Sequence, residues 1–115
     1  MRVLFIDDEP VRAKMIPNEH DVYIAHGGEQ VGYYLHEKRY DLVCCDHDMP
    51  MMDGLAVCSN FLVQLNLPVI VHSQNIVCGP RMVQLLQDYS VWSKWVPYSG
   101  EGWWQKVLDI FGSRI

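Results

Sequence analysis

The fold of this chain is decided by residues 40–54, which read Tyr-Asp-Leu-Val-Cys-Cys-Asp-His-Asp-Met-Pro-Met-Met-Asp-Gly. A fully apolar run, Leu42 to Cys45, ends abruptly in the carboxylate of Asp46. A proline and an Asp-Gly pair then favour a loop before the next apolar pattern begins. The stretch therefore predicts a buried β-strand that delivers one acid to the end of a sheet.

A second apolar run, Val3 to Ile6, ends in the same way, in Asp7-Asp8-Glu9-Pro10. In an open α/β sheet, ligands bind at the carboxyl ends of the strands. Two strands that end in acids therefore predict one acidic pocket at that edge of the sheet. The alternative is that both acidic clusters only cap the helices that follow them. Because both clusters follow fully apolar strands, we favour the pocket.

The other apolar patterns alternate between short runs and helical periodicity. We predict strands at residues 2–7, 21–25, 42–46, 68–72 and 91–96, and helices at residues 11–16, 29–38, 55–65, from 79–80 onward, and 101–111. This alternation indicates an α/β fold: a doubly wound, five-stranded parallel sheet with helices on both faces. The first strand is apolar on both faces, which predicts a central place in the sheet.

Composition narrows the class of protein. With 115 residues, of which 50% are hydrophobic, the chain suits one domain over residues 1–115 and is too apolar to be disordered. A net charge of −5 argues against binding to duplex DNA. We expect no signal peptide and no membrane span. The cysteines lack metal-ligand spacing, so we expect buried thiols in a reducing cytoplasm.

The two acidic motifs together resemble the receiver domain of two-component response regulators, over nearly the whole chain. Residues 3–10 are similar to that family's first strand and acidic pair, and residues 46–54 to its phosphoacceptor motif. The resemblance implies a flavodoxin-like sheet with strand order 2-1-3-4-5. It also implies that Asp7 and Asp8 bind a metal, that Asp46 accepts a phosphoryl group, and that a histidine kinase or another protein is a partner.

Three carboxylates at one sheet edge would repel one another unless a cation lies between them. Hard oxygen ligands favour Mg²⁺ or Mn²⁺, with water and a backbone carbonyl expected to complete the octahedron. The expected metal-binding residues are Asp7, Asp8, Asp46 and, through its carbonyl, Asp48. Such an ion would screen the acids, so that a phosphate can approach and be attacked by Asp46.

The sequence departs from the receiver pattern after the fourth predicted strand. Receivers usually carry Thr or Ser followed by Ala at that strand end, and a Lys-Pro pair after the fifth strand. Here Ser73 is followed by Gln74, which would crowd the path of a phosphoryl group. Val96 stands where the lysine is expected, and Lys94 lies two residues earlier. The cation that converts phosphorylation into a switch is therefore absent from its usual place.

Several segments instead resemble a receiver variant proposed to act on cyclic phosphates or related nucleotide ends. They are residues 46–48, 72–75, 79–82 and 95–98, and Arg12 matches an arginine that follows that variant's acidic pair. The resemblance implies a metal-dependent phosphoesterase that acts on a phosphate-bearing small molecule or a nucleotide end. Residues 49–54 are closer to ordinary receivers, so the chain is a hybrid by motif.

Histidines near the predicted pocket suit such chemistry, because two of them could act as general acid and base beside a metal-bound phosphate. The candidate catalytic residues are Asp46, His47, His72 and Ser73, and the candidate phosphate-binding residues are Arg12, Ser73 and Asn75. Each also has a plainer interpretation. His72 would be a strand-end residue bonded to backbone, and His47 and Arg12 would be surface side chains.

Three functions therefore remain open. The first is a phosphoesterase that processes cyclic phosphates. The second is a phosphoacceptor response regulator of a two-component phosphorelay, phosphorylated on Asp46. The third is a degenerate receiver that acts only as an interaction module. The changes near Gln74 and Val96 favour the first or the third, whereas the intact acids disfavour the third.

Overall fold

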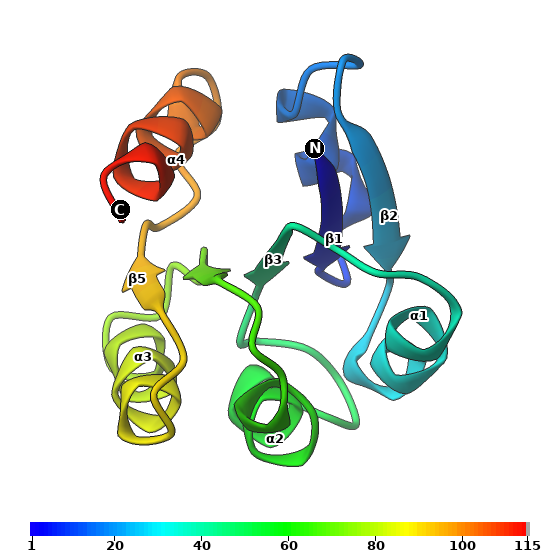
Figure 1. Cartoon of the computed structure of the whole chain (residues 1–115), viewed down its shortest axis with the longest axis vertical. Coiled ribbons are helices and arrows are strands. Elements are labelled where there is room, and N and C mark those ends of the chain that lie inside the picture. The colour runs from blue at the N-terminus through cyan, green and yellow to red at the C-terminus, as the bar shows by residue number, and fades with distance from the viewer. Residues whose placement is uncertain (115) are drawn as a thin grey trace.

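The computed structural model describes residues 1–114 of the 115-residue chain. Five parallel strands form one sheet in the order β2-β1-β3-β4-β5. They are β1 (Arg2–Ile6), β2 (Asp21–Ala25), β3 (Leu42–Cys45), β4 (Val69–Val71) and β5 (Ser93–Trp95). The predicted α/β class, the parallel pairing and the expected strand order are confirmed, and Figure 1 shows helices on both sides of the sheet.

The first strand is interior but not central. β1 pairs with β2 along one edge and with β3 along the other, and β3 occupies the middle of the order. The prediction of a central first strand is therefore wrong by one position. Apolar residues on both faces indicate that a strand is covered on both faces. They do not rank one interior strand above another, and residues 42–45 are as fully buried as residues 3–6.

Helices are distributed unequally between the two faces (Figure 1). One face carries α1 (Val31–Glu37), α2 (Gly54–Asn60) and α3 (Cys78–Asp88), with the short 3-10 helices η2 (Gly28–Gln30) and η3 (Leu62–Gln64) beside them. The opposite face carries α4 (Trp103–Gly112) and the 3-10 helix η1 (Pro10–Met15). Both faces of the sheet are therefore buried, which explains the fully apolar strands.

Two predicted helices differ from the observed ones for identifiable reasons. The segment 11–16 forms 3-10 turns only, because prolines lie at both of its ends and few residues separate them. The segment 55–65 leaves the α-helix at Phe61, whose backbone has a φ of −127°. The Phe61 ring packs on α1, where a Cβ at Gly32 would lie only 3.2 Å from it. Tertiary packing therefore decides this break.

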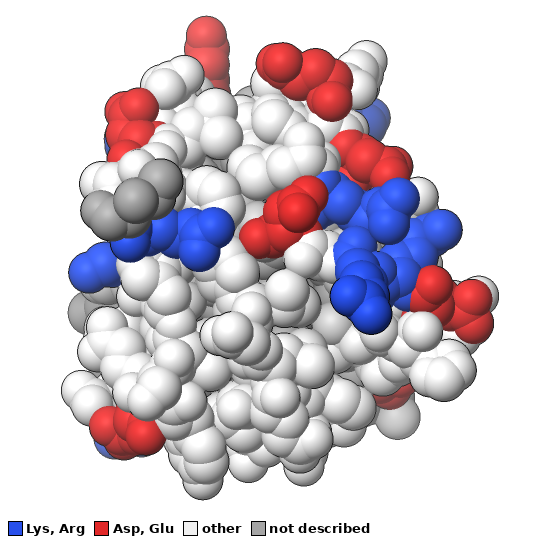
Figure 2. Space-filling model, viewed as in Figure 1, with Lys and Arg blue, Asp and Glu red and all other residues white. Residues whose placement is uncertain are grey.

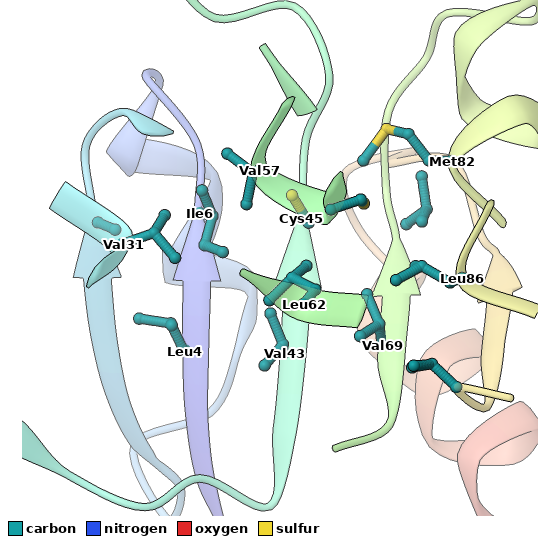
Figure 3. Packing of buried hydrophobic residues seen from close by; sticks show 14 of the residues in the cluster. Leu4, Ile6, Val31, Val43, Cys45, Val57, Leu62, Val69, Met82 and Leu86 are labelled. Atoms are coloured by element: carbon teal, nitrogen blue, oxygen red, sulfur yellow. The ribbon is translucent and has the colours of Figure 1, made fainter. Parts of the chain in front are cut away.

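A continuous apolar core holds the sheet against α1, α2 and α3. Figure 3 shows side chains of β1, β3 and β4 pointing toward side chains of those helices. The cluster includes Leu4, Ile6, Val43, Cys45, Val69, Val57, Leu62, Met82 and Leu86, none of which is more than 1% exposed. Because protein cores are close-packed, the ends of β1 and β3 are held at fixed positions relative to each other.

The opposite face is anchored by Trp103 of α4, which is fully buried. Its indole ring meets the Phe5 ring edge-on, with centroids 6.1 Å apart. Its Nε1–H donates a hydrogen bond to the carbonyl of Val96 at 2.9 Å. Trp103 thereby ties α4 both to β1 and to the segment that follows β5.

The surface does not concentrate one sign of charge on the face that Figure 2 shows, where Lys and Arg side chains gather beside Asp and Glu. The expected lack of duplex DNA binding stays a prediction. Within residues 1–114, no helix combines the length and the apolar character needed to cross a bilayer.

Gly54, the first residue of α2, is expected to tolerate no side chain. A Cβ there would overlap the carbonyl oxygen of Asp46 and lie 2.7 Å from the Cα of His47. We expect Gly54→Ala to lower the free energy of unfolding by roughly 1–3 kcal/mol, as overpacking does. Gly112→Ala is the matched control, because a Cβ at Gly112 meets no atom of the described residues within 4 Å. Urea melts check this, and equal midpoints for the two variants would contradict it.

Candidate functional site

Strand alternation brings three polar side chains into one row at the carboxyl end of the sheet. Phe5 faces the α4 side of β1, so Asp7, two residues later, faces the same side. Asp46 and His72 take the equivalent places after β3 and β4. Their backbone N–H groups donate to carbonyls of the neighbouring strand at 2.9 and 3.0 Å, which continues the register of the ladder. The row therefore crosses three adjacent strand ends.

The predicted cluster of acids is present at this edge. One carboxylate oxygen from each of Asp7, Asp8 and Asp46 lies within 4.8 Å of the other two. Asp7 is 0% and Asp46 is 4% exposed, whereas Asp8 is open to solvent. Burial raises the pKa of Asp46 above its ordinary value, and the negative charge of Asp7 adds to this effect. His72 and Arg12 act in the opposite direction and lower the pKa, but by less. The pair of buried carboxylates is therefore under-compensated in charge.

His72 lies beneath the acids. It is fully buried, and its Nε2 shares a 2.9 Å hydrogen bond with Oδ2 of Asp7. Its ring stacks on the Phe5 ring with centroids 4.5 Å apart, and its Nδ1 has no hydrogen-bond partner among residues 1–114. The plainer interpretation had placed its bond on backbone, but the partner is a carboxylate. In this position the imidazole supports Asp7 from within the core.

Asp7 itself is held by several donors. Its Oδ1 accepts a hydrogen bond from the backbone N–H of Glu9 at 2.8 Å, and Arg12 lies 3.5 Å from its Oδ2. Burial alone would raise the pKa of Asp7, but the hydrogen bond and charge of His72, with the help of these donors, lower it below its ordinary value. Asp7 is therefore a fixed, ionised carboxylate.

Arg12 reaches the acids from η1, and its side chain is only 19% exposed. Its Nη1 lies 3.9 Å from Oδ2 of Asp46, and its Nη2 lies 3.1 Å from Oε2 of Glu9. The guanidinium also lies over the Tyr98 ring, 5.3 Å from its centroid. The plainer interpretation of Arg12 as a solvated surface residue does not hold.

His47 is buried as well, which corrects its interpretation as a surface residue. Its side chain is 11% exposed, and its Nδ1 lies 2.7 Å from Oδ1 of Asp48. Its Nε2 has no hydrogen-bond partner in the part of the chain that the structure describes, and it lies 3.7 Å from a carboxylate oxygen of Asp53. The hydrogen bond from His47, followed by one from Asn75, lowers the pKa of Asp48. These contacts order the loop between β3 and α2.

Ser73 and Asn75 are engaged in local structure. The backbone N–H of Asn75 donates to Oγ of Ser73 at 3.0 Å. Oδ1 of Asn75 accepts hydrogen bonds from the N–H groups of Val77 and Cys78, which begin α3. Its Nδ2 donates to Asp48 at 3.2 Å. The amides at this helix start are therefore already bonded by Asn75.

A small cleft of about 140 Å³ opens above Asp46. Its lining residues are Glu9, Arg12, Asp46, Asp48 and Gln74. Gln74 lines the cleft, and its Nε2 donates to the carbonyl of Tyr98 at 2.8 Å. That it crowds the path of a phosphoryl group stays a prediction. Arg12 is the basic residue of this lining, whereas Lys94 is exposed on β5 and Val96 is 4% exposed in the core.

These residues fit a divalent cation. Carboxylate oxygens from three residues converge, and hard cations such as Mg²⁺ prefer oxygen ligands. The under-compensated charge of Asp46 supplies the electrostatic reason. Arg12 offsets that charge only in part, because its distances to Asp7 and Asp46 exceed those of a charged hydrogen bond.

Sequence reasoning missed how these residues are joined. The pairing of His72 with Asp7 spans 65 residues, and no local pattern encodes it. Strand alternation carried part of the signal, because Ile70 and His72 face one side of β4. The contact between Arg12 and Tyr98 could not be found in this way, since both residues lie outside the strands.

The comparisons with known proteins agree with this fold. The chain is similar to the response regulator TrrA from Thermotoga maritima in complex with Mg²⁺ and BeF, with a TM-score of 0.73 and 21% identity over 96% of each chain. It is similar to a receiver protein from Pseudomonas putida, with a TM-score of 0.71 and 20% identity over 98% of this chain and 96% of that one. It is also similar to the phosphorylated cyanobacterial phytochrome response regulator RcpA, with a TM-score of 0.71 and 19% identity over 99% and 95% of the two chains.

At these identities the structural likeness shows the fold alone. A search among curated proteins found no match. The family model for the response regulator receiver domain matches residues 3–87, a range that contains all three acids of the cluster and His72. The chain therefore belongs to the response regulator receiver domain family.

Proposed function

We propose that this domain is a phosphoacceptor of a two-component phosphorelay, phosphorylated on Asp46. The observation that carries the proposal is the acid cluster, in which Asp46 lies beside Asp7 and Asp8 at the floor of an open cleft. Receiver domains typically receive the phosphoryl group from histidine kinases, so the proposed partner is a kinase of that class, in the cytoplasm.

The chemistry requires one displacement at phosphorus. An oxygen of Asp46 attacks the phosphorus atom, so that an O–P bond forms and the bond from phosphorus to the donor nitrogen or oxygen breaks. The donor leaves with the bonding electron pair and takes a proton from solvent. Asp46 is only 4% exposed and faces the cleft, which supports access along a single direction.

Asp7, Asp8, Asp46 and the carbonyl of Asp48 are the proposed ligands of Mg²⁺ or Mn²⁺. When bound, the ion supplies positive charge that screens the acids from one another and from the incoming phosphoryl group. His72 keeps Asp7 in one orientation from below. His47 and Asn75 keep Asp48 at the cleft through their hydrogen bonds to its side chain.

Processing of cyclic phosphates finds no support in the comparisons, which match ordinary receivers. The geometry also disfavours His72 as the general acid of a phosphoesterase. A general acid must reach the leaving oxygen, but His72 is fully buried and bonded to Asp7. His47 is held on Asp48, and Asn75 caps α3. The phosphoacceptor function is therefore the better proposal.

Mg²⁺ is expected to raise the melting temperature of the wild type, because an ion that binds only the folded state stabilises it. Asp46→Asn should remove most of this rise. Asp88→Asn is a matched control, since Asp88 is an exposed carboxylate in the last turn of α3 and should leave the rise intact. Thermal melts with Mg²⁺ or EDTA measure this. An undiminished rise in Asp46→Asn would show that the ion binds elsewhere.

Without metal, Asp46→Asn is expected to melt above the wild type at neutral pH. Burial and the charge of Asp7 raise the pKa of Asp46, so its ionisation disfavours the folded state. A raised pKa gives a stabilising contribution that is complete below the pKa of the unfolded state and is lost as the pH rises through the folded value. The gap between the two proteins should therefore narrow as the pH falls toward about 4, the ordinary value for Asp.

Melts in EDTA across this pH range check the sign of the effect. A wild type that is more stable than Asp46→Asn at pH 7 would contradict it.

Acetyl phosphate with Mg²⁺ is expected to add one phosphoryl mass to the wild type and none to Asp46→Asn. The product should be labile to hydroxylamine, as acyl phosphates are. In parallel, 2′,3′-cyclic nucleotides should not be hydrolysed by the wild type faster than by the variant. Hydrolysis by the wild type alone, without phosphorylation, would favour the enzyme over the phosphoacceptor.

A further inference from the structure

The cleft above Asp46 obtains its positive charge from an unexpected element. Arg12 comes from η1, between β1 and β2, whereas receivers usually provide a lysine after the fifth strand. That place is occupied here by Val96, which is buried in the core. Lys94 is exposed on β5 and does not line the cleft within the described residues. A phosphoryl group on Asp46 would therefore meet the guanidinium of Arg12.

The present contacts of Arg12 leave its guanidinium available. Among residues 1–114, its only short ion pair is the one at 3.1 Å to Glu9, whose side chain is 59% exposed. Its distances of 3.5 Å to Asp7 and 3.9 Å to Asp46 are longer than hydrogen bonds to a charged group. A guanidinium carries five N–H donors in a planar fork that matches the oxygens of a phosphoryl group.

Tyr98 lies between this cation and a tryptophan of α4. The guanidinium lies 5.3 Å from the Tyr98 ring, and the same ring lies 5.4 Å from the ring of Trp103 in α4. The backbone of Tyr98 is bonded on both sides, by its N–H to the carbonyl of His72 and by its carbonyl to the side chain of Gln74. The backbone is thus fixed, and the ring is the part that can follow Arg12.

We infer that Arg12 takes the place of the missing lysine: it binds a phosphoryl oxygen on Asp46 and, through the Tyr98 ring, changes the surroundings of Trp103. The inference rests on the proposed phosphorylation of Asp46 and names the residue that detects it. Arginine suits both tasks, because a planar guanidinium stacks on an aromatic ring while its edge donates hydrogen bonds. Glu9 holds the guanidinium until the phosphoryl oxygens compete for it.

The test uses beryllium fluoride with saturating Mg²⁺ as the phosphoryl mimic, on the whole chain. Arg12→Gln is expected to weaken binding of the mimic by about tenfold to a hundredfold, the range for a hydrogen bond to a charged group. Its affinity for Mg²⁺ alone should be unchanged or higher, because one positive charge near the acids is removed. Lys94→Gln should bind the mimic and Mg²⁺ with the same affinities as the wild type.

The coupling has its own readout, the indole N–H resonance of Trp103. The mimic should shift this resonance in the wild type and leave it in place in Arg12→Gln. Arg12→Lys keeps the charge but loses the planar stack, so it should recover part of the affinity and little of the shift. Tyr98→Leu should retain affinity for the mimic to within about threefold and lose the shift, since the hydrogen bonds to the anion remain.

The outcomes separate the inference from the proposed function. A wild type that neither binds the mimic nor becomes phosphorylated would overturn both. A wild type that binds it, beside an Arg12→Gln variant that binds it equally well, would overturn only the inference. Equal losses of Mg²⁺ and mimic affinity in Arg12→Gln would do the same, because they would indicate a structural role. Loss of affinity for the mimic in Lys94→Gln alone would show that Lys94, and not Arg12, binds the phosphoryl oxygen.

Discussion

The site depends on the repulsion between carboxylates at the ends of two adjacent strands. β1 and β3 pair directly, so the side chains that follow them cannot move apart without breaking the sheet. Two of the three acids are almost completely buried, where charges interact more strongly than in water. The surrounding residues can be understood as responses to this constraint. His72 offsets charge from below, Arg12 offsets it from the side, and the cleft admits a cation from above.

His72 and Arg12 compensate the negative charge of the two buried carboxylates unequally. The pKa of Asp7 is lowered and that of Asp46 is raised, so neighbouring carboxylates in one row have opposite shifts. Asp7 has a dedicated partner in His72, whereas Asp46 has no close basic partner in the described chain. A carboxylate without such a partner retains its lone pairs for another ligand. We expect the carboxylate to make the metal-free fold less stable than an amide at position 46 would, while leaving its oxygens free to react.

Sequence reasoning located the acids because each of them follows a fully apolar strand. The same logic gave the fold, since apolar runs that alternate with helical periodicity leave few topologies. It failed where contacts are distant in sequence. It also failed in the loop after β3, where His47 contacts carboxylates of Asp48 and Asp53 along a backbone path that no sequence pattern predicts. The break at Phe61 depends on its packing against α1. Arg12 could be named as a candidate, but only the structure brings it to Tyr98.

The stack of Phe5 on His72 has a consequence for how this chain can change. The two residues extend from β1 and β4, which are separated by β3 and thus by about 9.6 Å, twice the usual strand spacing. Their ring centroids are nonetheless 4.5 Å apart, so both rings lean over β3. The β3 residue that faces the same side, Cys44, is small enough to allow this. We therefore expect positions 5, 44 and 72 to change together, because a bulkier residue at position 44 would meet the two leaning rings.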